Sequence, residues 1–344
     1  MLAAVVICRN EERWIERSLR AALAAVDPYA GAEVVLVDSC SSDGTVERAL
    51  RLPVRVVELR DDVATSPALG RLVGQALTRS RYLLFVDGDT EIDAAWVAAA
   101  VDHLETHPGV GGVDGALAEV WYDGERVVGG SPDVFGAPSE AAEVGFLGGN
   151  AVFRRAALDR AGSYNPFVVS YEEAELAARL RQAGATVVRL PMRMGTHHTL
   201  PRGSLQELGR RYRNNLIKGY GQVLRLGLRQ GTFREHAWNM RRYLQFQAVL
   251  VIGLLAGLVA LVTRDARWIT ASAALGIGLL LLFMLRSRSV AKPFRLLADW
   301  MVWTPPMLRG FLESPRDPHT VRPLEAIARQ RTGQGTAEPA AGTA

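Results

Sequence analysis

The segment Arg81-Tyr-Leu-Leu-Phe-Val-Asp-Gly-Asp-Thr90 places two carboxylates at the end of an apolar run. The run at 82–86 is predicted to form a buried strand, with Asp87 and Asp89 at its carboxyl end. Ligands bind at that end of the strands in open parallel sheets. A turn relaxed by Gly88 would let both aspartates reach one hard divalent cation, Mg²⁺ or Mn²⁺. Because Asp-Gly also forms ordinary turns, the rest of the chain has to decide between these interpretations.

The first 190 residues alternate apolar strand patterns with helical patterns. Strands are expected at 2–8, 33–37, 54–58, 82–86 and 186–190, and helices at 11–25, 44–51, 67–78, 94–105 and 172–183. Near-continuous apolar strands separated by helices predict a parallel sheet covered on both faces. Residues 110–150 are richer in glycine and break this alternation, so irregular or antiparallel strands are expected there.

Two uncharged apolar runs follow, at 243–262 and 268–285. Each is close to the roughly 20 residues that a helix needs to cross a bilayer. A short charged turn, 263–267, joins them, so they are predicted to form a helical hairpin. Basic residues flank both ends of the hairpin and favour a cytoplasmic location for these ends, although Arg264 and Arg267 in the turn weaken the asymmetry. The alternative is a buried hairpin in the core of a soluble protein.

Composition narrows the possible partners of the 344-residue chain. Its net charge is +4, its basic residues are nearly all arginines, and a cluster of these arginines lies around the apolar region. This placement favours anionic lipid headgroups or phosphates, and no motif for binding nucleic acid is present. The two cysteines, Cys8 and Cys40, lack the spacing of a zinc site, and a reducing compartment is the simpler interpretation.

Five segments fall at predicted strand ends or helix starts. They are 5–12, 34–45, 70–74, 87–89 and 147–154, the last followed by 170–179. In this order and spacing the set resembles the family 2 glycosyltransferases, over about residues 1–200. The resemblance implies the GT-A fold, which is a Rossmann-like α/β fold. It also implies inverting transfer of a sugar from a nucleotide-diphosphate sugar.

The resemblance implies roles for individual residues. Asp38 would contact the nucleobase. Arg71 would contact the nucleotide or the diphosphate, although Leu72 replaces the usual Asn; the alternative is a solvated helix charge. Asp87 would lie near the ribose and the metal, and Asp89 would bind the metal directly. The nucleotide- or sugar-binding set is completed by Arg9, Asn10, Glu11, Gly88, Gly149 and Asn150.

An inverting transfer also needs a general base for the acceptor hydroxyl. The family has Glu-Asp at the start of a helix, and this chain has Glu172-Glu173. Glu173 is therefore the expected base, with Glu172 as the alternative. Both could instead be helix N-terminal acids favoured by the dipole. His197 or His198, expected in a loop after the last strand, would be a third metal ligand or an ordinary loop histidine.

These inferences divide the chain into five regions. We expect a GT-A catalytic domain at 1–202, basic amphipathic interfacial helices at 203–242, a transmembrane hairpin at 243–285, an interfacial segment at 286–329 and a disordered tail at 330–344. The catalytic domain is expected on the cytoplasmic side of the inner membrane. Its expected partners are a nucleotide-sugar donor, a lipid-linked or membrane-associated glycan acceptor and membrane lipids, but no nucleic acid.

Three alternatives to a single-sugar transferase were weighed. A polyprenyl-phosphate sugar synthase usually has Gln where this chain has Glu91. A processive polysaccharide synthase carries Gln-x-x-Arg-Trp and more membrane spans than two. A non-catalytic membrane scaffold that binds nucleotide sugars is disfavoured by the four intact carboxylates Asp38, Asp87, Asp89 and Glu173.

Overall fold

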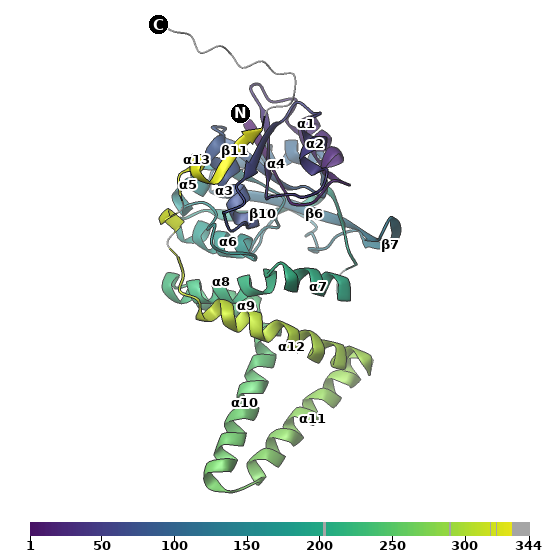
Figure 1. Ribbon diagram of the computed structural model, residues 1–344, viewed down its shortest axis with the longest axis vertical. Coiled ribbons are helices and arrows are strands. Elements are labelled where there is room, and N and C mark those ends of the chain that lie inside the picture. Colours follow the sequence, from purple (N-terminus) through teal and green to yellow (C-terminus); the bar gives the residue numbers. More distant parts are fainter. Residues whose placement is uncertain (202–203, 289, 317, 321, 332–344) are drawn as a thin grey trace. The chain divides into compact units, whose positions relative to one another are not determined.

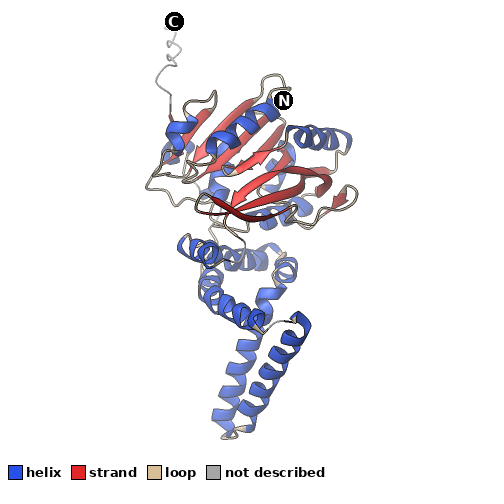
Figure 2. Ribbon diagram, turned by 90° about the vertical axis from the view of Figure 1, so that its right-hand side faces the viewer, coloured by secondary structure: helices blue, strands red, loops and turns tan. Residues whose placement is uncertain are grey.

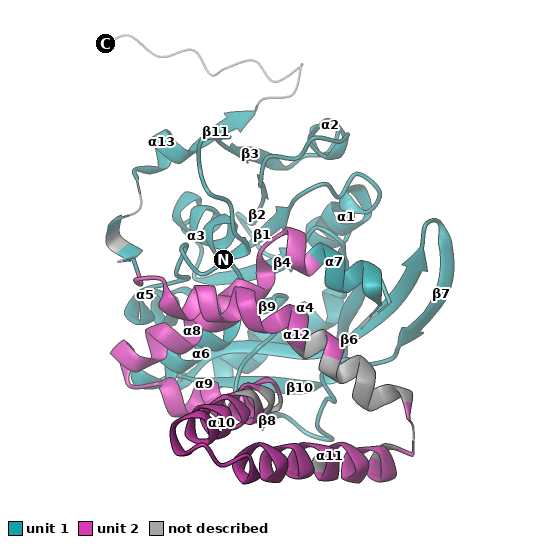
Figure 3. Cartoon of the chain, turned by 60° about the horizontal axis from the view of Figure 1, so that its bottom comes forward, with its two compact units in different colours: residues 1–210, 316–344 teal, residues 211–315 magenta. Residues whose placement is uncertain are grey.

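The computed structural model describes residues 1–201, 204–288, 290–316, 318–320 and 322–331. The chain forms two compact units, shown in different colours in Figure 3: unit 1 contains residues 1–210 and 316–344, and unit 2 contains residues 211–315. The chain therefore leaves unit 1 after Arg210 and returns to it at Arg316. Most of the tail expected at 330–344 lies outside the described residues.

Unit 1 is built on one mixed sheet, with its main strands in the order β11-β3-β2-β1-β4-β9-β6-β10-β5. The parallel part consists of β1 (Leu2–Cys8), β2 (Glu33–Asp38), β3 (Arg55–Leu59) and β4 (Tyr82–Asp87). Every residue of β1 is buried, because β1 lies between β2 and β4 and is covered on both faces. Figure 2 shows the blue helices on the two faces of the red sheet. The predicted α/β fold is thus confirmed.

The alternation of side chains along β1 supplies two separate cores. Ala4 and Val6 belong to one core, and Val5 and Ile7 belong to the other. The first core is covered by α1 (Ile15–Val26), α2 (Thr45–Ala49) and α4 (Ala94–Thr106). The second is covered by α3 (Pro67–Leu77), α5 (Arg155–Ala161) and α6 (Glu172–Gln182).

The rest of the sheet combines parallel and antiparallel pairs. It contains β5 (Thr90–Ile92), β6 (Val110–Asp123), β7 (Arg126–Ser131), β8 (Ala142–Glu143), β9 (Ala151–Arg154) and β10 (Thr186–Thr199). β9 runs antiparallel to both β4 and β6. Within the glycine-rich region at 110–150, β6 pairs antiparallel with β7, as expected, and parallel with β10.

The prediction that the last strand ends at Leu190 was wrong. β10 continues to Thr199, with irregular register between Arg189 and Gly195. A proline lacks the N–H that a ladder requires, and the irregular register accommodates Pro191 without ending the strand. His197 and His198 consequently lie on a strand, where neighbouring side chains point to opposite faces.

The C-terminal part of unit 1 adds an edge strand. After η1 (Pro318–Thr320) come α13 (Leu324–Ile327) and β11 (Ala328–Arg331), which pairs antiparallel with β3. Ile327 is buried in the second core, and Arg329 lies 3.2 Å from Glu58. The sequence had suggested an interfacial segment up to residue 329, so this strand was not anticipated.

Unit 2 is helical. It contains α8 (Leu216–Gln230), α9 (Phe233–Asn239), α10 (Arg241–Thr263), α11 (Arg267–Ser287) and α12 (Ala291–Leu312), and α7 (Leu205–Arg213) spans the junction with unit 1. α8 and α12 pack closely at glycines, since a Cβ on Gly221 would lie 1.8 Å from the carbonyl oxygen of Met307. The rings of Tyr243 and Trp303 stack with centroids 4.5 Å apart.

Helices α10 and α11 form a long hairpin (Figure 1). Segments Tyr243–Thr263 and Arg267–Arg286 have mean hydropathies of 2.4 and 2.1, and almost none of their length is buried. By length and composition, both helices are able to cross a membrane. Their exposure argues against the alternative of a buried hairpin in a soluble core.

Candidate active site

The carboxyl ends of the parallel strands bring the predicted aspartates to one edge of the sheet. In the strand register Cys8 pairs with Asp38, and Ile7 pairs with Asp87. The backbone N–H of Gly88 donates to the Ile7 carbonyl at 2.8 Å. A Cβ on Gly88 would lie 2.7 Å from the Cβ of Cys8, so glycine is required where the turn crosses β1.

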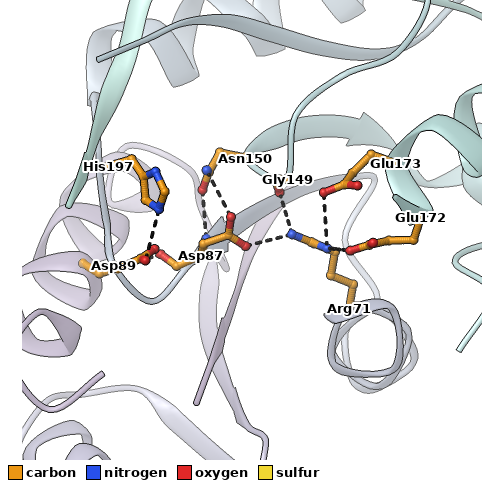
Figure 4. A network of polar contacts seen from close by, with 9 residues as sticks. Arg71, Asp87, Asp89, Gly149, Asn150, Glu172, Glu173 and His197 are labelled. Carbon is orange, nitrogen blue, oxygen red and sulfur yellow. Dashed lines mark hydrogen bonds and ion pairs between the residues drawn. The ribbon is translucent and has the colours of Figure 1, made fainter. Parts of the chain in front are cut away.

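Arg71, on α3, occupies the centre of a buried polar cluster (Figure 4). Its side chain is 2% exposed and donates to Asp87 at 2.8 Å and to Glu172 at 2.6 Å. Glu173 lies 4.0 Å from the same guanidinium. The interpretation of Arg71 as a solvated helix charge does not hold. Instead one permanent cation joins the turn Asp87-Gly88-Asp89, the aspartate turn, to the start of α6.

The two glutamates at the start of α6 have different surroundings. The Glu172 side chain is 3% exposed and paired with Arg71, whereas the Glu173 side chain is 24% exposed. Burial and the neighbouring Glu172 raise the pKa of Glu173 to about 8, although Arg71 opposes the rise. Glu173 can therefore be reached from solvent and can take up a proton near neutral pH.

Gly149 and Asn150 lie between the aspartate turn and the glutamates. The Asn150 side chain accepts from the backbone N–H of Asp87 at 2.8 Å and so holds the turn in place. A Cβ on Gly149 would lie 2.5 Å from Arg71 Nη2, 2.8 Å from Asp87 Oδ2 and 3.3 Å from Glu173 Oε1. The lack of a side chain therefore lets the backbone of Gly149 pass close to these charged groups, where even a methyl group would not fit.

At the other end of the aspartate turn, Asp89 faces His197. Asp89 Oδ2 lies 3.1 Å from Nε2 of the imidazole, and Glu119 Oε1 lies 3.2 Å from its Nδ1. Burial lowers the pKa of His197, but Asp89 and Glu119 outweigh this effect and raise it to about 10.

His198 has other partners. Its Nε2 lies 2.7 Å from Glu91, its Nδ1 lies 3.2 Å from the Tyr122 hydroxyl, and its ring stacks on Trp14 with centroids 4.2 Å apart. Only its backbone N–H contacts Asp89, at the carbonyl oxygen. The structure thus brings His197, but not the side chain of His198, to the predicted metal ligand.

The loops after β1 and β2 are tied together near Asp38. Asp38 is 1% exposed and accepts from the backbone N–H of Ser41 at 2.8 Å and from the Cys8 thiol at 3.3 Å. Asn10 adopts a left-handed φ of 58° and accepts from the Ser42 N–H. Arg9 donates to Thr65 at 3.3 Å.

Glu11 borders a pocket of about 280 Å³ that opens beside Asp89. Aromatic and charged side chains line the pocket, among them Trp14, Tyr122 and Arg210. Burial and the nearby Asp89 raise the pKa of Glu11 to about 9.

The residues at this end suit a divalent cation only in part. Among the described residues, no group of three or more His, Cys, Asp or Glu side chains is arranged as a complete metal site. Asp89 and His197 nevertheless present one carboxylate oxygen and one imidazole nitrogen to the same space. This donor set fits a cation that takes its remaining ligands from a substrate and water.

Comparison with known proteins identifies the family of the N-terminal domain. Residues 3–161 match the model of the family described as Glycosyl transferase family 2. They form a family 2 glycosyltransferase domain. The prediction that the chain is a glycosyltransferase is confirmed. A comparison with curated proteins gave no match.

Solved structures share the fold of the glycosyltransferase. A mannosyltransferase of Pyrobaculum calidifontis, solved with GDP-Man and Mn²⁺, has 18% identity and a TM-score of 0.56, covering 87% of this chain and 86% of its own. Residues 1–349 of S. aureus TarS, solved with UDP-GlcNAc, have 18% identity and a TM-score of 0.51, covering 74% and 80%. At this identity the likeness concerns the fold alone.

Two features of the site were missed in the sequence. Glu119 lies in the region for which only irregular strands were expected, and its one signal was a carboxylate within an apolar stretch. Arg71 was singled out, but its burial between carboxylates could not be read from a helical pattern.

Proposed function

We propose that this chain is a membrane-anchored, inverting glycosyltransferase. It would move a sugar from a nucleotide-diphosphate sugar to a hydroxyl of a lipid-linked or cell-envelope glycan. One observation carries the proposal: the accessible carboxylate of Glu173 and the turn at Asp87 share Arg71, and the backbone of Gly149 passes close to all three. The proposed base and the proposed donor site thus lie side by side around one cation.

The donor would lie along the carboxyl ends of β1, β2 and β4. We assign the nucleobase and ribose to the loops that hold Asp38, Arg9, Asn10 and Glu11, and the sugar to Gly149 and Asn150. Asp87 lies between these groups and would face both the ribose and the diphosphate. The GDP-Man and UDP-GlcNAc held by the structural relatives support a nucleotide-sugar donor of this kind.

Glu173 would act as the general base. Its carboxylate takes the proton of the acceptor hydroxyl while the oxygen attacks the anomeric carbon. The bond between that carbon and the diphosphate oxygen breaks on the opposite side, so the configuration is inverted and a nucleoside diphosphate leaves. Glu172 stays paired with Arg71 and holds this guanidinium in position rather than accepting the proton.

We assign the metal to Asp89 and His197, with Asp87 nearby, and leave His198 out of the ligand set. A bound Mg²⁺ or Mn²⁺ would supply positive charge against the leaving diphosphate. Arg71 would offset part of the negative charge of Asp87 and hold this carboxylate in place beside the diphosphate.

The hairpin would anchor the enzyme in the cytoplasmic membrane, with unit 1 on the cytoplasmic side. The chain leaves unit 1 after Arg210 and returns at Arg316, and β11 pairs within the sheet of unit 1. A segment inserted between these points has to cross a bilayer an even number of times. Two helices satisfy this requirement, and anchoring raises the local concentration of a membrane-bound acceptor.

Transfer is tested with the purified full-length protein in lipid nanodiscs. A panel of UDP- and GDP-sugars is supplied with Mn²⁺ and a polyprenyl-linked glycan, and release of nucleoside diphosphate is measured. We expect release from one donor, its loss in Glu173→Gln and full activity in the exposed control Glu16→Gln. Binding of a donor without release by the wild type would favour the scaffold alternative. Release that is unchanged in Glu173→Gln would overturn the assignment of the base.

Topology is tested in intact cells with single cysteines and a membrane-impermeant maleimide. Ala266→Cys, in the hairpin turn, is expected to react from outside. Glu125→Cys, in the exposed turn between β6 and β7, is expected to react only after lysis. Labelling of both sites before lysis, or of neither, would contradict a hairpin that spans the membrane.

A further inference from the structure

Glu119 stands directly behind His197 on the neighbouring strand. In the register of β6 and β10 the two residues are paired, and Glu119 Oε1 lies 3.2 Å from His197 Nδ1. The other carboxylate oxygen, Oε2, accepts from the indole N–H of Trp121 at 2.9 Å. The Glu119 side chain is 1% exposed, so its orientation is set by the protein and not by solvent.

We propose that Glu119 is a positioning residue that makes His197 a metal ligand, by fixing the tautomer and the orientation of its ring. The inference rests on the proposed function, because it concerns the same cation. It goes beyond that function by naming the buried residue that supports the ligand. The juxtaposition of Trp121, Glu119, His197 and Asp89 in one chain of contacts carries it.

The geometry decides which ring nitrogen faces the cation. A hydrogen bond from Nδ1–H to Glu119 leaves the lone pair of Nε2 for a metal, and Nε2 is the atom that lies 3.1 Å from Asp89. Carboxylates in this position fix the orientation of ligand histidines and increase their basicity. Without Glu119 the ring would be free to turn or to present the other tautomer.

A nitrogen ligand affects which metal ion the site binds more tightly. Mg²⁺ binds almost entirely through oxygen, whereas transition metals accept imidazole nitrogen as well. A site of aspartates and a diphosphate alone would suit both cations. Adding a histidine held in place by a buried carboxylate shifts the balance toward Mn²⁺.

The chain contains a matched control on the opposite face of the same strand. His198 also contacts a carboxylate, Glu91, but its ring faces Tyr122 and Trp14 and not the aspartate turn. The pairs His197–Glu119 and His198–Glu91 both join an imidazole to a carboxylate, and only the ring of His197 contacts the carboxylate of Asp89. A general effect of removing a carboxylate near a histidine would therefore appear at both pairs.

The experiment measures binding of Mn²⁺ alone to the purified full-length protein, by the electron paramagnetic resonance signal of free Mn²⁺. We expect Glu119→Gln to weaken Mn²⁺ binding by about 10- to 100-fold. Glu91→Gln is expected to leave it unchanged. Competition with Mg²⁺ is measured in parallel, and His197→Asp is expected to reduce the preference for Mn²⁺ because it replaces the nitrogen with oxygen.

Each outcome decides the inference separately from turnover. Wild-type Mn²⁺ affinity in a folded Glu119→Gln variant, or an equal loss in Glu91→Gln, would overturn it even if the enzyme transfers sugar. A selective loss of binding would support it even if no donor in the panel is turned over. If Glu119→Gln fails to fold, Trp121→Phe is measured instead. It removes only the hydrogen bond from the indole N–H to Glu119 and is expected to weaken Mn²⁺ binding by a smaller factor. Unchanged binding in Trp121→Phe would then count against it.

Discussion

The two ends of the candidate site each hold one cation among carboxylates, but the cations differ in kind. At the base end Arg71 lies among Asp87, Glu172 and Glu173. At the metal end His197 lies between Asp89 and Glu119. A guanidinium stays protonated and cannot be replaced, whereas an imidazole can give up its proton and bind a metal. The positive charge at the base end is therefore permanent, whereas at the metal end a metal ion can replace the proton of the imidazole.

This difference predicts that the two ends control different kinetic constants. Glu173→Gln removes the base and is expected to lower kcat by about 10²- to 10⁴-fold, with little change in the KM for the donor. Asp89→Asn is expected instead to raise the KM for the donor and the Mn²⁺ concentration required. Steady-state kinetics at saturating acceptor measure both. Identical changes in kcat and KM for the two variants would mean that the ends do not act separately.

The fixed cation is expected to matter more for stability than the exchangeable one. Arg71→Met leaves three carboxylates without their buried partner and is expected to cost about 3–5 kcal/mol of unfolding free energy. His197→Gln keeps a hydrogen-bonding group and is expected to cost about 1 kcal/mol. Denaturant unfolding followed by tryptophan fluorescence compares the two. A larger loss in His197→Gln would reverse the comparison.

Because Gly149 packs closely against Arg71, a single added methyl group can displace the base end without removing a charge. The methyl of Gly149→Ala would lie 2.5 Å from Arg71 Nη2, so the guanidinium and its carboxylates have to shift. A displacement of about 1 Å is expected to lower kcat by about 100-fold. Gly145→Ala is the control, because nothing lies within 4 Å of its added methyl. Equal activity of the two variants would show that the base end tolerates displacement.

The pH dependence of kcat tests the protonation state of Glu173 at the base end. Burial and Glu172 raise the pKa of Glu173 to about 8, and only the ionised form can accept a proton. At saturating Mn²⁺, kcat is therefore expected to rise about tenfold per pH unit up to pH 8 and then to level off. The residual activity of Glu173→Gln is expected to lack this step. A plateau that already begins near pH 5 would contradict the assignment.

The comparison also shows what the sequence could predict. Apolar runs that end in Asp38 and Asp87 predicted the parallel strands and the edge at which the site lies, because a run of buried residues leaves the chain few other ways to pack. The two uncharged runs predicted the hairpin because a helix makes its backbone hydrogen bonds within one segment and does not depend on a neighbouring strand. Both inferences depend on local composition alone.

Other features depend on residues distant in the sequence. The continuation of β10 past Pro191 follows from its pairing with β6 and β5, which holds the strand across the irregular register. The edge strand β11 was hidden because its partner β3 lies more than 250 residues earlier in the chain. A short stretch such as Ala-Arg-Gln-Arg has no strand signal of its own.

The sequence by itself indicated a family 2 glycosyltransferase domain and an apolar hairpin, because motif order and hydrophobic patterning are local properties. The tertiary structure decided which partners each charged residue has. It buried Arg71 between two motifs, separated Glu172 from Glu173, and turned His197 toward Asp89 and His198 away. The physical reason is that a charge in a protein interior is defined by its neighbours, and those neighbours come from strands and helices that meet only when the chain folds.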